Sequence, residues 1–139
     1  MAIEEFMKIA VLGGGNGSYA AASDLSEAGH EVRFWRRDAA ALEPVRASGT
    51  IRLRDFQGVR DVKIARPTVD IGEAVRGAEL IVAPVPAFAQ RDLAITLAPH
   101  LADGQVIYLP PGTFGSYLMM TVLRQRELEQ QKTSAAEAK

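Results

Sequence analysis

The sequence contains no cysteine, which excludes a disulfide framework and any metal site built from thiolates. It also has no apolar run near the roughly 18 residues that a membrane span needs. Residues 1–6 carry acidic side chains where a secretory signal would carry basic ones. The formal net charge of −1 gives no electrostatic case for binding nucleic acid or a membrane surface. The expected compartment is therefore the cytoplasm.

The length of 139 residues and the 47% hydrophobic content fit one globular domain. A chain of about 150 residues buries roughly 70% of its unfolded surface, so a self-supporting core is feasible. We expect this domain to span residues 1–123. Residues 124–139 are largely polar and are expected to form a helical or frayed tail.

The first third of the sequence predicts a strand–helix–strand unit. Residues 7–12 form a short apolar run that stops at glycine, as a buried strand does. Residues 18–28 follow with small apolar side chains at helical spacing, and Gly29 stands where a left-handed helix cap belongs. Residues 31–36 are rich in β-branched and aromatic side chains. A crossover of this kind requires the two strands to be parallel.

The rest of the chain continues the alternation of helices and strands. Asp38 is placed to cap a helix that Gly49 ends, and Pro99 should end the regular part of a later helix. The predicted elements are a helix over 38–48, a hairpin over 50–55 and 60–65, a helix over 71–76, a strand over 79–83, a helix over 87–101, a strand over 105–109, a helix over 114–131 and a frayed end over 133–139. This order predicts an α/β fold, a doubly wound, mostly parallel Rossmann sheet flanked by helices, with a small hairpin insertion near 50–65.

A glycine-rich turn stands between the first predicted strand and helix, with the sequence Gly13-Gly14-Gly15-Asn16-Gly17-Ser18. Gly13 can make the tight turn, and Gly15 lets the backbone approach a pyrophosphate without a Cβ in the way. Ser18 is small enough for close helix–strand packing, and its hydroxyl is free to cap the helix or to bind phosphate. The amide groups and dipole of the helix favour an anion there. The alternative is a structural turn that binds no nucleotide; the Walker-type phosphate loop is excluded, because its spacing and lysine are absent.

The end of the second predicted strand carries Arg36 and Arg37, where domains specific for NAD normally place an acidic residue. Guanidinium groups bind a 2′-phosphate that a carboxylate would repel, so the preferred cofactor is NADP rather than NAD. The alternative leaves both arginines in solvent and turns Asp38 toward the ribose hydroxyl. Trp35 is a candidate for the adenine side of the site, and it is equally suited to the core.

Two proline-containing loops follow later predicted strands, at the edge of the sheet where open α/β folds bind ligands. Val85, Pro86 and Ala87 belong to the first loop and Pro111 to the second, and both loops are candidates to border the cofactor. The alternative is that the prolines only end the strands.

Neither histidine has a partner at a spacing typical of a general base or a metal site, so His30 and His100 are interpreted as surface residues. Arg91 and Asp92 are assigned to a solvated helix face. The sequence therefore predicts no catalytic residues and no metal ligands in this chain.

Several segments together resemble the opine (octopine-type) dehydrogenases. The first is residues 8–18 with the Gly-Asn-Gly form of the turn, followed by an alanine-rich helix and Gly29-His30-Glu31-Val32. The others are Val85-Pro86-Ala87-Phe88-Ala89 and the run from Leu97 to Gln105, with Pro111-Gly112-Thr113-Phe114-Gly115 beyond it. The resemblance covers about residues 7–120, and ketopantoate reductase and glycerol-3-phosphate dehydrogenase share the domain.

The resemblance implies reductive condensation of an amino acid with a 2-oxo acid, using hydride from a nicotinamide cofactor. It implies that Gly13, Gly15, Asn16, Gly17 and Ser18 hold the pyrophosphate and that Pro86 and Ala87 border the cofactor. Members of the family usually continue into a helical second domain that supplies the catalytic histidine. We expect that domain to be absent here and the chain to bind its cofactor without turnover. Arg36 replaces the acidic residue of NAD-using members, which favours NADP.

Two other functions compete with this interpretation. One is a non-catalytic dinucleotide sensor or interaction module, with an apolar helix face over 114–123 that includes Tyr117, Leu118, Met119 and Met120 and forms a homo-oligomer or holds a separate catalytic subunit. The other, weaker one is an S-adenosylmethionine-dependent methyltransferase, a fold that usually also has an acidic residue where Arg36 stands.

Overall fold

The computed structural model describes residues 5–112 and 114–138. Thr113 of the second proline loop, Lys139 of the expected tail and residues 1–4 of the expected domain lie outside the described residues. Along the chain the elements are β1 (Lys8–Leu12), α1 (Asn16–Glu27), β2 (Glu31–Trp35), α2 (Ala39–Ser48), β3 (Thr50–Asp55), β4 (Gly58–Lys63), β5 (Arg66–Thr68), α3 (Ile71–Val75), β6 (Leu80–Val82), α4 (Ala87–Leu97), the 3₁₀ turn η1 (Ala98–His100), β7 (Val106–Tyr108) and α5 (Gly115–Glu137).

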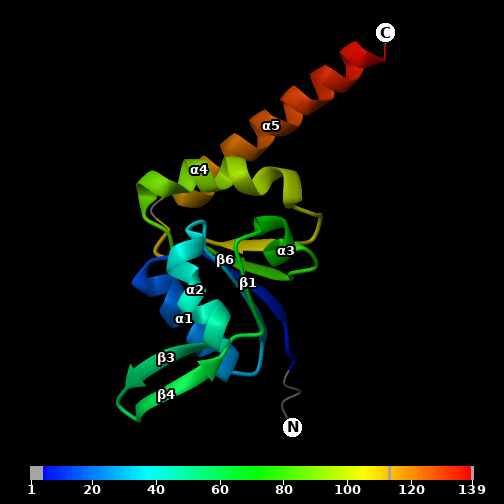
Figure 1. The fold of residues 1–139 in the computed structure, drawn as a ribbon. Helices are drawn as coiled ribbons and strands as arrows, with labels where there is room; N and C mark the ends of the chain where they lie inside the picture. Colours follow the sequence, from blue (N-terminus) through cyan, green and yellow to red (C-terminus); the bar gives the residue numbers. More distant parts are fainter. Residues whose placement is uncertain (1–4, 113, 139) are drawn as a thin grey trace.

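The centre of the fold is a five-stranded sheet with the order β5-β2-β1-β6-β7. Every neighbouring pair in it is parallel. The chain starts in the middle at β1, runs outward to β5, and then crosses to β6 and β7 on the other side. The strand order therefore reverses between β1 and β6, which is the ligand-binding position in open α/β sheets. Helices cover both faces (Figure 1), so the prediction of a doubly wound Rossmann fold is confirmed.

Because side chains alternate along a strand, β1 contributes to a separate core on each face of the sheet. Ile9 and Val11 pack with apolar residues of α1 and α2, including Leu42. Ala10 and Leu12 pack with apolar residues of α3, α4 and α5. Strands covered on both faces have near-continuous apolar sequences, which explains why the run at β1 was readable as a buried strand.

The start and end of α2 follow the predicted cap chemistry. The Asp38 carboxylate accepts a hydrogen bond from the Ala41 amide at 3.1 Å. Gly49 ends the helix with φ +70°, a left-handed conformation that glycine adopts without strain. These local signals therefore fixed both ends of the helix.

The sequence-based prediction was wrong about β5 and about the last helix. The prediction omitted β5, a three-residue edge strand that contains Pro67, because it is too short to show an alternating pattern. The last helix begins at Gly115 and continues to Glu137, so the expected fraying from residue 133 is not observed among the described residues. The first helix begins at Asn16, two residues earlier than predicted, and its C-terminal cap residue is Ala28 instead of Gly29, although Gly29 does have a positive φ of 98°.

The predicted hairpin is present as β3 and β4, which form a separate antiparallel pair. It is attached to the main body by Arg60 of β4, whose guanidinium donates to the Glu27 carboxylate of α1 and to the Asp55 carboxylate of β3, the latter at 2.9 Å. These hydrogen bonds lower the pKa of both carboxyls and raise the pKa of Arg60. The ion pairs thus tie the insertion to α1.

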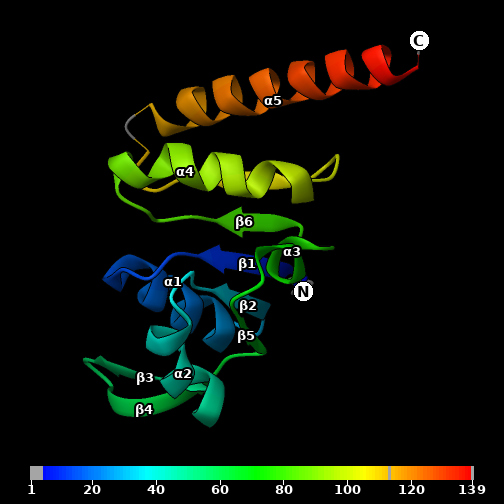
Figure 2. The ribbon, with the colours of Figure 1, turned by 45° about the horizontal axis from the view of Figure 1, so that its top comes forward.

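The two C-terminal helices lie side by side on one face of the sheet (Figure 2). The front of α5 packs into the core through Met119 and Val122, which are 2% and 4% exposed. From Arg124 to Ala138 every residue is exposed, and α5 continues away from the body (Figure 1). None of the helices in the described part of the chain is long and apolar enough to span a membrane.

Candidate dinucleotide-binding site

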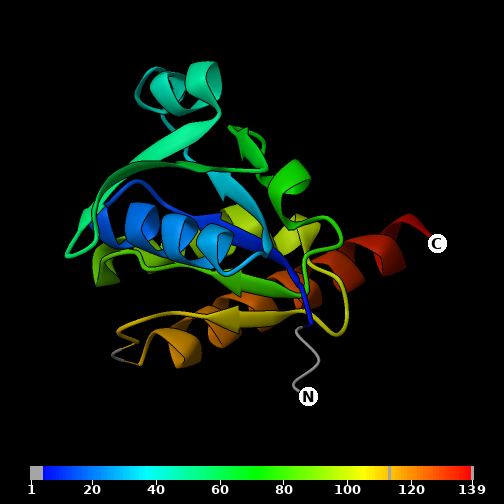
Figure 3. The ribbon, with the colours of Figure 1, turned by 90° about the horizontal axis from the view of Figure 1, so that it is seen from below.

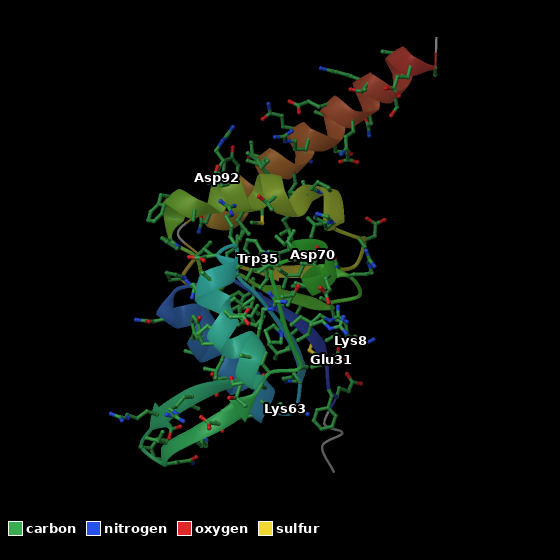
Figure 4. The ribbon with its side chains drawn as sticks, in the orientation of Figure 1. Lys8, Glu31, Trp35, Lys63, Asp70 and Asp92 are labelled. Carbon is green, nitrogen blue, oxygen red and sulfur yellow. The ribbon has the colours of Figure 1, made fainter. Side chains whose placement is uncertain are left out.

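A cleft of about 380 Å³ opens at the carboxyl ends of β1, β2 and β6, where the strand order reverses. Three segments that are distant in the sequence meet there: the glycine-rich turn after β1, the residues that end and follow β2, and the loop after β6 with the first turns of α4. In Figure 4, Asp92 lies on α4 and Trp35 lies below it beside the sheet. The lining residues are Gly13, Gly14, Trp35, Arg36, Arg37, Asp38, Val85, Pro86, Phe88, Ala89, Asp92 and Leu93.

Gly13 makes the tight turn at the end of β1. Its φ is +123°, and a Cβ at this position would lie 2.7 Å from the Ser18 hydroxyl and 3.0 Å from a methyl group of Val85. Its amide donates to the Trp35 carbonyl at 3.0 Å, which joins the turn to the end of β2. Both the conformation and the close contacts therefore require glycine here, as the sequence indicated.

The open part of the turn is at Gly15, the N-cap residue of α1, where a Cβ would meet no atom within 4 Å. No side chain caps this helix, and Asn16 and Gly17 at its start are exposed. The first amide groups of a helix have no partner within it, so they are available to a bound anion. A pyrophosphate placed against Gly15 would meet these amides at the positive end of the helix dipole.

Ser18 lies beneath the turn instead of facing the cleft. The residue is fully buried, and its hydroxyl donates to the Leu12 carbonyl at 3.4 Å. The predicted close packing of helix on strand is confirmed. The alternative in which the Ser18 side chain caps α1 is wrong, because the hydroxyl is already used by β1 and the cap residue is Gly15.

Arg36 is half-buried and lies across the glycine-rich turn. A Cβ on Gly14 would lie 2.5 Å from Arg36 Nε and 2.8 Å from its Cζ and Nη2. Nη1 donates to the Tyr19 hydroxyl at 2.7 Å. Within residues 5–112 and 114–138 no carboxylate forms an ion pair with this guanidinium. The positive charge of Arg36 therefore stands beside the place where the turn favours an anion.

The neighbours of Arg36 have distinct positions in the cleft. Arg37 is exposed on its wall. Asp38 also lines the cleft, and one of its two carboxylate oxygens, Oδ1, caps α2 by accepting from the Ala41 amide. Trp35 is only 6% exposed and its indole donates to the Val69 carbonyl at 2.9 Å. Trp35 is thus a core residue whose edge lines the cleft. The two interpretations of Trp35, as a core residue and as part of the adenine side of the site, are therefore compatible.

The two proline loops differ in how they relate to the cleft. Val85 and Pro86 line it, and Pro86 is the N-cap residue of α4, followed by Ala87 as the first helical residue. Pro111 follows β7 at the same edge of the sheet but is not among the residues that line the cleft. The first loop is therefore brought together with the glycine-rich turn, and the second is not.

Sequence reasoning missed the wall that α4 provides. Phe88 and Asp92 are one helical turn apart, as are Ala89 and Leu93, and all four line the cleft. Asp92 is exposed, as predicted for a solvated face, yet it lines the same cleft as Arg36 and Arg37. The i, i+4 spacing directly after Pro86 was the signal that could have indicated this wall.

Neither histidine lines the cleft. The His30 ring accepts a hydrogen bond from the Met7 amide at 3.1 Å, so it holds the N-terminal segment and is half-buried instead of fully exposed. His100 is exposed at the end of η1. Among residues 5–112 and 114–138, no group of three or more histidine or carboxylate side chains could hold a metal ion.

The parallel sheet, the glycine-rich turn and the cleft at the reversal of strand order define a dinucleotide-binding domain of the Rossmann class. Comparison with known proteins gives the family. The chain belongs to the family described as NAD-dependent glycerol-3-phosphate dehydrogenase N-terminus, whose model matches residues 8–134. The chain therefore carries the dinucleotide-binding domain of this family.

Individual relatives carry two different activities in their names. The chain is 39% identical over 101 residues to a glycerol-3-phosphate dehydrogenase [NAD(P)+] of Nitratidesulfovibrio vulgaris, covering 73% of this chain and 30% of the relative. It is 37% identical over 112 residues to an opine dehydrogenase of an Arthrobacter species, covering 78% and 30%. The crystal structure of glycerol-3-phosphate dehydrogenase from Coxiella burnetii shares the fold, with a TM-score of 0.67 over 85% of this chain and 38% of that one at 20% identity. The chain thus spans about 30% of the length of the curated relatives it matches.

Proposed function

We propose that this chain is the cofactor-binding domain of a dehydrogenase of the glycerol-3-phosphate or opine type, and that it selects NADP. The observation that carries the proposal is the cleft itself, in which the glycine-rich turn and the positive charge of Arg36 lie side by side. The relatives support both reactions, reduction of a ketone to an alcohol and reductive condensation of an amino acid with a 2-oxo acid.

The geometry of the cleft indicates how the cofactor would lie. Its pyrophosphate would sit at Gly15, Asn16 and Gly17, where the amides at the start of α1 are available. The adenosine end would lie in the cleft between Arg36 and α4. The nicotinamide end would then point toward the loop at Val85–Ala87, with Pro111 further along the same edge.

The preference for NADP is argued from charge. Arg36 and Arg37 stand where a 2′-phosphate would lie, and each guanidinium offers donors in a planar fork that matches phosphate. A charge-assisted contact of this kind contributes about 1.5–3 kcal/mol, which corresponds to a preference of roughly ten- to hundredfold over NAD.

Titration of the purified chain with NADPH and with NADH tests this proposal, with Trp35 fluorescence as the signal, because the indole edge lines the cleft. We expect NADPH to bind more tightly, and Arg36→Met to bring its affinity down to that of NADH. Tighter binding of NADH by the wild-type chain would reject the selection of NADP while keeping the cofactor role. Binding of neither cofactor, checked by calorimetry, would reject the cofactor role.

We further propose that the chain alone binds its cofactor without turnover, since it spans only about 30% of the length of the relatives whose names carry the two activities. NADPH oxidation can be followed with dihydroxyacetone phosphate, or with pyruvate and an amino acid. Steady-state oxidation by the pure chain with any of these substrates would contradict this part of the proposal.

A second candidate function is protein binding, with or without cofactor sensing. The side chains of Val106 and Tyr108 on β7 are 58% and 57% exposed, and those of Tyr117 and Met120 on α5 are 75% and 60% exposed. Figure 3 shows β7 at the edge of the sheet. The predicted face over 114–123 is smaller than expected, because Met119 is buried in the core. Sedimentation at increasing concentration tests self-association, and a monomer throughout would exclude a homo-oligomer through this face.

A further inference from the structure

Tyr19 holds the side chain of Arg36 by two independent contacts. Its hydroxyl accepts a hydrogen bond from Arg36 Nη1 at 2.7 Å. The guanidinium carbon also lies 5.6 Å from the centroid of the tyrosine ring, within the range of a cation–π contact. Tyr19 belongs to the first turn of α1, and Arg36 directly follows β2.

The ring of Tyr19 is itself fixed by the core. It packs edge-on against Phe34, with ring centroids 4.9 Å apart and planes at 70°. Phe34 is fully buried on β2. Because the Tyr19 ring packs on a buried strand residue, its hydroxyl has a defined position. The hydrogen bond to this hydroxyl therefore also fixes the position of the Arg36 guanidinium.

These contacts hold the guanidinium beside the glycine-rich turn. Its Nε, Cζ and Nη2 atoms lie next to the position that a Cβ on Gly14 would take, while Nη1 donates to Tyr19. A guanidinium has five N–H donors, and the hydroxyl of Tyr19 uses one of them. The remaining donors stay available at the wall of the cleft, and Tyr19 itself does not line that cleft.

We propose that Tyr19 is a positioning residue for cofactor selection, which orders Arg36 in advance for the 2′-phosphate of an NADP-type dinucleotide. This inference rests on the proposed selection of NADP by Arg36. A free arginine side chain samples many rotamers, and ordering it during binding weakens affinity. Holding it in place beforehand removes that cost for a ligand with a 2′-phosphate and changes nothing for a ligand without one.

The test compares Tyr19→Phe with the wild-type chain by calorimetry with NADPH and NADH. Phenylalanine keeps the packing on Phe34 and the ring under the guanidinium but removes the hydrogen bond. We expect NADPH affinity to fall about two- to tenfold, as for the loss of one hydrogen bond, and NADH affinity to stay within twofold. Tyr117→Phe makes the same chemical change at an exposed position on α5 and should alter neither affinity.

A double-mutant cycle separates the outcomes. In an Arg36→Met background, Tyr19→Phe should have no further effect on NADPH affinity, since the residue acts through Arg36. If Arg36→Met abolishes selection of NADPH while Tyr19→Phe leaves it unchanged, the role of Tyr19 is rejected and the proposed function stands. Equal loss of NADPH and NADH affinity in Tyr19→Phe would also reject it. If the wild-type chain does not select NADPH, both proposals of NADP selection fail together.

Discussion

At the scale of single residues, three consecutive glycines of the turn have three different reasons to be glycine. Gly13 has a positive φ and close neighbours, Gly14 makes room for the Arg36 side chain, and Gly15 keeps open the space in front of α1. Sequence spacing identified Gly13 and Gly15 but gave no reason for Gly14, because its contact comes from a side chain that lies 22 positions further along the chain. The glycine spacing therefore predicts the backbone conformation of the turn, but it does not predict that the Arg36 side chain lies beside Gly14.

Substituting Gly14 and Gly15 one at a time distinguishes the preference for NADPH over NADH from the affinity for both cofactors. In Gly14→Ala the new methyl group would displace the flexible end of Arg36, so we expect the ratio of NADPH to NADH affinity to fall about tenfold or more. In Gly15→Ala the methyl group meets no protein atom but occupies the approach of the pyrophosphate, so both affinities should fall together. Calorimetry with both cofactors measures the two ratios.

Both substitutions should leave the fold intact, since neither backbone position has a positive φ. The loss of a glycine N-cap in Gly15→Ala should cost less than about 1 kcal/mol. If Gly14→Ala weakens NADPH and NADH equally, Arg36 does not select the cofactor from the position seen here.

At the scale of elements, segments with a continuous apolar run, a clear apolar pattern or a cap were predictable, and β5, which has none of these, was not. The sequence predicted β1, α2 and the hairpin of β3 and β4, since each has a clear apolar pattern or a cap at its ends. It missed β5, whose three residues become a strand only because β2 pairs with them. It also missed the cleft wall on α4, because Phe88 and Asp92 acquire that role from the placement of the helix across the sheet.

The preference for NADP and the cytoplasmic location stay predictions.

The attachment of the hairpin to α1 should depend on pH. Arg60 lowers the pKa of Glu27 and Asp55 from their ordinary values of 4.5 and 3.8. A lowered pKa in the folded state means that these carboxylates stabilise the fold at neutral pH and lose that contribution as the pH falls through their folded-state pKa values. We therefore expect Arg60→Met to lower the melting temperature at pH 7 and to have a progressively smaller effect below about pH 4.

Arg54→Met is the matched control for this measurement. Arg54 lies on β3 of the same hairpin and is exposed, and it forms no ion pair with the described residues. Melting curves of both variants across pH 3–7 check the prediction. If Arg60→Met lowers the melting temperature equally across this pH range, Arg60 does not lower the pKa of these two carboxyls.

At the scale of the whole molecule, the two cores lie on opposite faces of one sheet. A substitution that disrupts the packing of either core should therefore destabilise the entire fold. Leu97 at the end of α4 is fully buried in the core on the α4 face. We expect Leu97→Ala to reduce the free energy of unfolding by about 2–5 kcal/mol, as for other buried leucines. Leu128→Ala, at a site 51% exposed on α5, should change it by less than about 0.5 kcal/mol.

Denaturant unfolding followed by both Trp35 fluorescence and circular dichroism measures these changes. Coincident transitions are expected, because Trp35 belongs to the same core as Leu97. Two separate transitions in Leu97→Ala would mean that the two faces of the sheet unfold independently.

The exposed rear half of α5 has a consequence for the way the molecule moves in water. The residues of α5 that share a groove with α4 end at Glu129. A helix rises about 1.5 Å per residue, so the stretch from Gln130 to Glu137 extends roughly 12 Å beyond that groove. A compact chain of this length would have a radius of gyration of about 14 Å. With such a rod attached, the scattering profile should indicate a larger, elongated particle, and rotation about the axis of α5 should be faster than end-over-end tumbling.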